Sequence, residues 1–172
     1  MKVKVIYPFT PTWLDYPNNS SQAVVVHFLG CEHSCEGCHN PLFQQSDNPK
    51  AIEVSLTNLY DLLHKVCYEN RTNKVVFEGG DSLHTSNRNF TRQFINRYSR
   101  VFDICIYTGY SFDEVSKMEL KGFTFIKCGN FNRELFQSPT KTDSYIQLAS
   151  TNQEIYDTNF NLLTRNGRMY FK

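Results

Sequence analysis

Short apolar runs recur along the chain, separated by stretches with helical periodicity. Residues 23–29 (Ala-Val-Val-Val-His-Phe-Leu) are rich in β-branched residues and almost wholly apolar. This pattern is typical of a strand that is buried on both faces, as in a parallel sheet. Three further runs predict strands at residues 74–78, 102–107 and 123–127. A weaker alternation predicts an edge strand at residues 1–7.

Helices are predicted between these strands. Leucines and a valine at helical spacing mark one face over residues 56–66, and Ser55 stands where an N-cap is expected. Aromatic and aliphatic residues from Phe90 to Tyr98 mark a second helix. Ser111-x-x-Glu114 is a capping box, which predicts the start of a third. Residues 8–21 and 41–50 show neither the alternation of a strand nor the spacing of a helix, and they predict loops.

Because strands and helices alternate at least three times, the sequence predicts βαβ units and a mostly parallel sheet. A full eight-stranded barrel typically needs about 250 residues, whereas this chain has 172. We therefore expect an α/β fold, a partial (open) β/α barrel, as one domain over residues 1–172. Its core is expected at about 22–130, with a C-terminal extension at 131–172. The extension is expected to hold strands at 145–148 and 168–171 and a turn at 151–153.

The charge balance argues against a nucleic-acid partner. The chain has 18 Lys and Arg against 17 Asp and Glu, a formal net charge of +1, which leaves no broad basic footprint. The first residues carry no apolar signal region. No uninterrupted apolar run approaches the roughly 20 residues of a membrane span. We therefore expect a cytoplasmic protein with neither a membrane nor a nucleic-acid partner.

Three of the six cysteines crowd into residues 31–38 at C-x3-C-x2-C spacing. Three thiolates this close together can hold three corners of a four-iron cluster and leave one iron open to a substrate, whereas four-cysteine clusters only pass electrons. The candidate metal ligands are Cys31, Cys35 and Cys38. The scattered Cys67, Cys105 and Cys128 are expected to be free core residues, because nothing marks the chain as secreted.

A zinc site of three cysteines and one histidine is the alternative at this loop. His39 is adjacent to Cys38, and neighbouring side chains point apart, so the two rarely bind one ion together. His33 lies within the loop and could serve only with a contorted backbone. The ligand preferences therefore favour an iron–sulfur cluster over zinc.

Two more unusual segments fall at predicted strand ends. In parallel α/β folds, ligands bind at the carboxyl ends of the strands. The cysteine loop follows the strand at 23–29, Gly79-Gly80-Asp81 follows the strand at 74–78, and Tyr107-Thr108-Gly109-Tyr110 closes the strand at 102–107. We therefore expect all three segments to meet at one edge of the sheet.

Each of these segments has a functional and a structural interpretation. Paired glycines let the backbone come close to a ligand, with Asp81 taking part in holding an ammonium group, although a tight turn also explains them. The Tyr107–Tyr110 segment is either a wall of a ligand cavity or aromatic packing at a strand end. His27 is expected to face the core or a pocket, and His64 and His84 are expected to have ordinary roles.

Together these motifs resemble those of the radical S-adenosylmethionine (SAM) enzymes. More narrowly, the chain resembles the activating proteins of anaerobic ribonucleoside-triphosphate reductase. The resemblance rests on residues 30–40, Gly79-Gly80-Asp81-Ser82-Leu83, Tyr107–Tyr110 and Ser150-Thr151-Asn152-Gln153, which follow the family's order. The chain departs from the family at Ser82, where proline is common, and at Cys128-Gly129, where Asp-Gly is usual.

The resemblance implies an oxidoreductase with a [4Fe-4S] cluster and SAM as cofactors. An electron from the reduced cluster would cleave SAM to methionine and a 5′-deoxyadenosyl radical, which would take a hydrogen from a glycine of the partner reductase. The residues implied are Cys31, Cys35 and Cys38 as cluster ligands, Gly37, Cys38 and His39 against SAM, and Gly79, Gly80 and Asp81 at its methionine end. No catalytic residue is expected beyond these ligands. The implied partners are the glycyl-radical large subunit of anaerobic ribonucleotide reductase and a low-potential electron donor.

Three alternatives stay open at this point. His39-Asn40-Pro41 is closer to the activators of pyruvate formate-lyase, so another glycyl-radical enzyme is a candidate partner. A radical SAM enzyme acting on a small molecule, such as a deazapurine synthase, calls for a closed pocket rather than an open mouth. A non-enzymatic electron carrier or a zinc-binding module is the third, and the missing fourth cysteine argues against the carrier.

Overall fold

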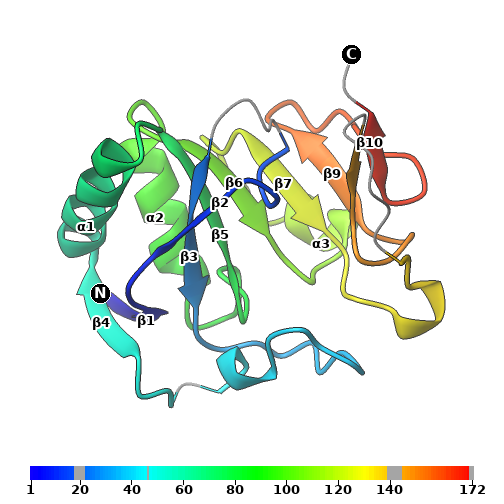
Figure 1. Ribbon diagram of the computed structural model, residues 1–172, viewed down its shortest axis with the longest axis horizontal. Helices are drawn as coiled ribbons and strands as arrows, with labels where there is room; N and C mark the ends of the chain where they lie inside the picture. The colour runs from blue at the N-terminus through cyan, green and yellow to red at the C-terminus, as the bar shows by residue number, and fades with distance from the viewer. Residues whose placement is uncertain (18–21, 46, 139–144, 171–172) are drawn as a thin grey trace.

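One mixed sheet of eight strands carries the fold (Figure 1). A computed structural model describes residues 1–17, 22–45, 47–138 and 145–170. The sheet contains β1 (Lys2–Ile6), β2 (Thr10–Thr12), β3 (Ala23–Phe28), β4 (Ala51–Ser55), β5 (Lys74–Gly79), β6 (Asp103–Tyr107), β7 (Phe125–Cys128) and β9 (Glu154–Asp157). Its order is β4-β1-β3-β5-β6-β7-β9, and β2 pairs with β3 beside this path. β8 (Tyr145–Gln147) and β10 (Arg168–Tyr170) form a separate antiparallel pair.

The centre of the sheet is parallel. Strands β3, β5, β6 and β7 run in one direction, and the chain segments between them contain α1 (Leu56–Glu69), α2 (Arg88–Tyr98) and α3 (Phe112–Ser116). Antiparallel strands complete the sheet on both sides. This arrangement confirms the expected α/β fold with an open, mostly parallel sheet. The carboxyl ends of the four strands point to the lower edge of Figure 1, where the cyan segment with the cysteines runs.

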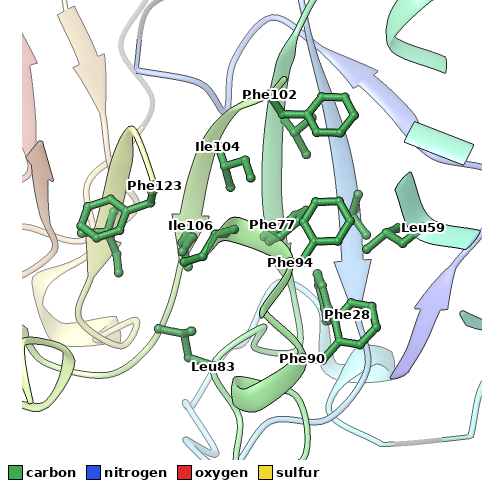
Figure 2. Packing of buried hydrophobic residues seen from close by; sticks show 14 of the residues in the cluster. Phe28, Leu59, Phe77, Leu83, Phe90, Phe94, Phe102, Ile104, Ile106 and Phe123 are labelled. Atoms are coloured by element: carbon green, nitrogen blue, oxygen red, sulfur yellow. The ribbon is translucent and has the colours of Figure 1, made fainter. Parts of the chain in front are cut away.

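The two faces of the sheet differ. One face packs against all three helices and forms the main core, in which Phe77 contacts Phe28 and Phe94 at ring-centroid distances of 5.1 and 5.5 Å (Figure 2). The other face carries a smaller cluster that includes Val25 and Cys105. Because side chains alternate along a strand, this second face also receives the polar residues near the carboxyl ends. They are His27, Glu78, Tyr107 and Lys127.

Local capping explains where the helices begin. The Ser55 side chain accepts a hydrogen bond from the backbone N–H of Asn58 at the start of α1. At α3, Ser111 and Glu114 make both hydrogen bonds of the predicted capping box. Side-chain acceptors at these positions satisfy backbone N–H groups that have no partner within the helix. The three predicted helices are therefore confirmed, as are the two predicted caps at Ser55 and Ser111.

Several predictions at the margins of the sheet were wrong. β1 is a strand but not an edge, because β4 pairs with its outer side in the register Val3↔Val54. The apolar pattern predicts no element at the residues of β4. β2 lies within the loop predicted at residues 8–21. Residues 18–21 of that loop, and Phe171 of the strand predicted at 168–171, are outside the described residues. β9 was missed, since only two of its four residues are buried. The sheet thus extends beyond the expected core of 22–130 on both sides.

Among the helices of the described residues, none combines the length and the apolar character that a membrane crossing needs.

Candidate iron–sulfur site

A cavity of about 820 Å³ lies at the carboxyl edge of the parallel strands. All three clustered cysteines line it, together with Gly79 and Gly80 at the end of β5 and residues 107–109 at the end of β6. The three segments that the sequence placed at one edge therefore meet around one space. The cavity is open to the surface, and Trp13, Leu14 and Phe136 at its lining are about half-exposed or more.

The loop that carries the cysteines is fixed at its base. The backbone N–H of Gly30 donates to the carbonyl of Phe43 at 2.8 Å, and Cys31 N–H donates to Gln44 at 3.2 Å. Ser34 and Gly37 adopt positive φ angles of 48° and 74°, so the chain turns sharply between the cysteines. All three thiols are free and half-buried. They are therefore accessible from the cavity while their backbone is held.

Burial also affects the chemistry of Cys31. It raises the pKa of this thiol to about 11, and the backbone N–H of His33, which donates to the sulfur, opposes that rise. A metal binds the thiolate rather than the thiol, so binding at this residue releases a proton. The positive charge of a bound metal favours the thiolate that burial alone disfavours.

The donor set fits a cluster with an open corner. Cys67, Cys105 and Cys128 are buried and do not line the cavity, so it offers three thiols and no fourth. Within the described ranges, no group of three or more Cys, His, Asp or Glu side chains converges on a single point, as a closed zinc site requires. In a [4Fe-4S] cluster each cysteine binds a different iron, so convergence on one point is not needed.

The two glycines of the Gly79-Gly80-Asp81 segment are required by packing of the chain itself. Gly79 has a φ of +110°, and a Cβ on it would lie 2.7 Å from the backbone of Phe28. A Cβ on Gly80 would lie 2.4 Å from the carbonyl oxygen of Gly30 and 2.5 Å from that of Phe43. These contacts are with backbone atoms of Phe28, Gly30 and Phe43, which cannot move aside as a flexible side chain would. The glycines thus bring β5 close to the base of the cysteine loop, and both also line the cavity.

Asp81 is not among the residues that line the cavity, and its part in holding an ammonium group stays a prediction. It is 1% exposed. Its Oδ1 accepts from the backbone N–H of Leu83 at 2.7 Å, and its Oδ2 accepts from Thr108 Oγ1 at 2.8 Å and Gly109 N–H at 2.9 Å. The same Oδ2 lies 2.8 Å from His33 Nε2. A carboxylate with four protein partners has little capacity left for a ligand.

The other predicted cofactor-binding residues lie in the same loop. Cys38 and His39 line the cavity, and the His39 ring is 5.4 Å from the ring of Phe131. Gly37 is not among the lining residues and faces Phe131 and Arg133 instead. Gly37 therefore serves the turn between two cysteines.

Three charged residues that the sequence analysis does not single out line the cavity, namely Asp15, Glu78 and Lys127. Lys127 is 8% exposed, and its ammonium donates to the carbonyl of Gly129 at 2.7 Å. Burial lowers its pKa to about 8, and nearby Asp81 opposes that shift. Burial raises the pKa of Glu78 to about 7, and Asp15 adds to the rise. The alternation of side chains along a strand could have found Glu78 and Lys127. A charged residue near the end of an apolar strand lies on the same face of the sheet as every second neighbour.

We predict a pH-dependent stability gain for Glu78→Gln. Between the ordinary pKa of 4.5 and the raised value of about 7, folded Glu78 holds a proton that the unfolded chain has released. The free energy of unfolding therefore falls as pH rises through this window and stays low above it. Glutamine removes this penalty, so its stabilisation of the cluster-free protein is expected to grow by about 2 kcal/mol from pH 5.5 to 8.5.

Urea unfolding at the two pH values measures this difference. Glu69→Gln, at an exposed position at the end of α1, is the matched control and is expected to show no such growth. An effect of Glu78→Gln that is equal at both pH values would contradict the prediction.

The Ser150-Thr151-Asn152-Gln153 segment supports the chain that closes one side of the cavity. Four of its hydrogen bonds reach residues 129–135. They are Asn132 N–H to Ser150 Oγ (3.3 Å), Thr151 N–H to Leu135 O (2.9 Å), Asn152 Nδ2 to Asn130 O (3.0 Å) and Gln153 Nε2 to Gly129 O (3.3 Å). Residues 129–135 in turn contact the cysteine loop, where Arg133 pairs with Glu36 at 2.8 Å. The 150–153 segment thus acts on the cavity indirectly, by holding the backbone of residues 129–135 in place.

Fold and cavity together define a class of protein, namely an α/β protein that presents three thiols at the carboxyl edge of a partial barrel. The sequence profile of the family described as 4Fe-4S single cluster domain matches residues 21–156. This match spans most of the chain, and the chain belongs to that family.

Individual relatives agree with this assignment. The chain is 29% identical over 140 residues to the anaerobic ribonucleoside-triphosphate reductase-activating protein of Enterobacteria phage T4, covering 79% of this chain and 83% of that one. It is 26% identical over 115 residues to the protein of the same name from Haemophilus influenzae, covering 61% and 69%. The solved structure of QueE from Escherichia coli is similar in fold, with a TM-score of 0.50 and 14% identity. That match covers 63% of this chain and 54% of the other.

Proposed function

We propose that this protein cleaves SAM reductively and installs a glycyl radical on an anaerobic ribonucleotide reductase. A [4Fe-4S] cluster, when bound, supplies the electron that breaks the sulfonium C–S bond and yields a 5′-deoxyadenosyl radical. The observation that carries the proposal is that three of six cysteines, and no fourth, line an open cavity beside the paired glycines. The two relatives named as activating proteins support the choice of partner.

Residues of this chain have separate tasks in the proposal. Cys31, Cys35 and Cys38 hold the cluster. The backbone of Gly79 and Gly80, which lines the cavity, receives the methionine end of SAM. His39 and Cys38 lie beside the rest of the molecule. Asp81 acts indirectly, because its carboxylate is buried and already hydrogen-bonded.

Charge in the cavity suits both ends of the methionine moiety. Among the described residues that line the cavity, Lys127 is the only lysine or arginine, and we assign it to the SAM carboxylate. Asp15 places negative charge in the same space, and Glu78 adds to it above the raised pKa of about 7 of its carboxyl group. Negative charge suits the ammonium and sulfonium groups. Charges of either sign interact more strongly with a ligand here than in water, because the buried side of the cavity is largely desolvated.

The open mouth favours a protein substrate over a small molecule. Only a cavity that admits a chain segment can bring a glycine α-carbon close to SAM, and this cavity opens between exposed apolar side chains such as Leu14 and Phe136. The likeness to QueE, at 14% identity, concerns the fold alone. A low-potential electron donor and a cytoplasmic location stay predictions.

The test is anaerobic reconstitution followed by assays with the partner. We expect about four irons and four sulfides per chain, an electron paramagnetic resonance signal of the reduced cluster that changes on addition of SAM, and 5′-deoxyadenosine on reduction. Incubation with an anaerobic ribonucleotide reductase is expected to give a glycyl-radical signal. A radical that forms only on a pyruvate formate-lyase would move the assignment to that partner. A protein that binds one zinc and no iron would overturn it.

A further inference from the structure

The ring of His33 is held by residues of two other motifs, Gly79-Gly80-Asp81 and Tyr107–Tyr110. His33 Nε2 lies 2.8 Å from Asp81 Oδ2, and the ring meets the edge of Tyr110 with centroids 4.6 Å apart. Gly109 leaves room for the ring, because a Cβ there would lie 2.3 Å from His33 Cδ2. The imidazole is thus held on three sides by residues 81, 109 and 110.

Asp81 is itself fixed, which makes it a firm attachment point. Its carboxylate accepts from Thr108 and Gly109 at the end of β6, and its backbone N–H donates to the carbonyl of Gly30 at 2.7 Å. One residue therefore joins the ends of β5 and β6 to the start of the cysteine loop. Since an ionised carboxylate only accepts hydrogen bonds, His33 Nε2 carries the proton of the contact.

His33 is also placed to act on the cysteines. It stands between Cys31 and Cys35, and its backbone N–H donates to the Cys31 sulfur. The base of the loop is fixed at Gly30 and Cys31 by hydrogen bonds to residues 43 and 44. The side chain of His33 adds an attachment in the middle of the loop, where Ser34 takes a positive φ of 48°.

We propose that His33, held by Asp81 and packed against Gly109 and Tyr110, is a positioning residue that preorganises the cysteine loop for the cluster. The inference rests on the proposed function only in naming the metal that the loop receives. It gives the Gly-Gly-Asp and Thr-Gly-Tyr motifs a joint role, because the aspartate and the Tyr110 edge support a residue of the cysteine motif.

Preorganisation has a measurable consequence. A loop that is ordered before the metal arrives loses less conformational entropy on binding, and groups that orient metal ligands typically contribute 10–100-fold to metal affinity. Removing the attachment is therefore expected to loosen the loop in the metal-free protein and to speed the loss of iron from the loaded protein by roughly tenfold to a hundredfold.

The experiment compares three variants with the wild-type protein. His33→Ala removes the ring, and His33→Gln restores an N–H donor of similar reach. Gly109→Ala pushes a methyl group into the ring position without deleting a polar group. His64→Ala, at an exposed position of α1, is the matched control. Hydrogen exchange of peptides covering residues 31–38 is measured on metal-free protein, and iron release to a chelator is measured after anaerobic reconstitution.

We expect faster exchange in the 31–38 peptides and faster iron release for His33→Ala and Gly109→Ala, partial rescue by His33→Gln, and no change for His64→Ala. The electron paramagnetic resonance g values of the reduced cluster are expected to shift in His33→Ala, because the N–H contact to the Cys31 sulfur is disturbed. A general loss of fold would raise exchange throughout the sheet and lower the thermal midpoint, and it would count against the proposal.

Wild-type exchange in the 31–38 peptides and wild-type iron release in His33→Ala would overturn the inference. Failure of the proposed function looks different. In that case the wild-type protein takes up no iron or makes no 5′-deoxyadenosine, while the exchange measurement on metal-free protein still decides whether His33 holds the loop.

Discussion

Cys35→Ala is expected to abolish both cluster assembly and SAM cleavage. Cys35 is one of three thiols that line the cavity, and no further cysteine lines it to take its place. With two thiolates left, a four-iron cluster has two unligated corners and is not retained. Iron after reconstitution should fall from about four per chain to less than about one, and 5′-deoxyadenosine should fall to background.

Cys67→Ala is the control for this result. Cys67 is free and buried in α1 on the helix-covered side of the sheet. Its loss should cost roughly 1 kcal/mol of stability through the small cavity it leaves, with iron content and product unchanged. If Cys35→Ala still held four irons and formed 5′-deoxyadenosine, the three-cysteine assignment would have to be abandoned.

Lys127→Met is expected to weaken SAM binding by tenfold to a hundredfold. A charge-assisted hydrogen bond contributes about 1.5–3 kcal/mol, and about 1.4 kcal/mol corresponds to a factor of ten. The change should appear in the Kd for SAM, measured by equilibrium dialysis with reconstituted protein. It should appear in the KM more than in kcat, because the carboxylate is remote from the bond that breaks.

Stability is expected to move in the opposite direction, which separates binding from folding. Burial lowers the pKa of Lys127 to about 8. Below that pH the folded protein keeps a disfavoured buried charge, and the penalty is lost as pH rises. Methionine removes the charge, so the variant should be at least as stable as the wild type at pH 7. Lys121→Met, on an exposed residue before β7, is the matched control. An unchanged Kd for SAM in Lys127→Met would rule out the assigned role.

The sequence determined the elements that depend on neighbouring residues. The apolar run at β3, the capping box at α3 and the cysteine spacing are all local patterns. They predicted a buried strand, a helix start and a metal-binding loop, each of which involves residues close together in the chain. The convergence on one edge also followed, because parallel strands end on the same side of a sheet.

Only the tertiary structure decided which distant residues meet. His33 and Asp81 are 48 positions apart, and nothing in either motif names the other as its partner. The need for glycine at position 80 arises from two carbonyl oxygens, those of Gly30 and Phe43, that come close only when the loop folds back. β4 and β9 are likewise strands because β1 and β7 offer them unpaired backbone groups. Contacts of this kind depend on packing between elements, and they cannot be predicted from the periodicity within one element.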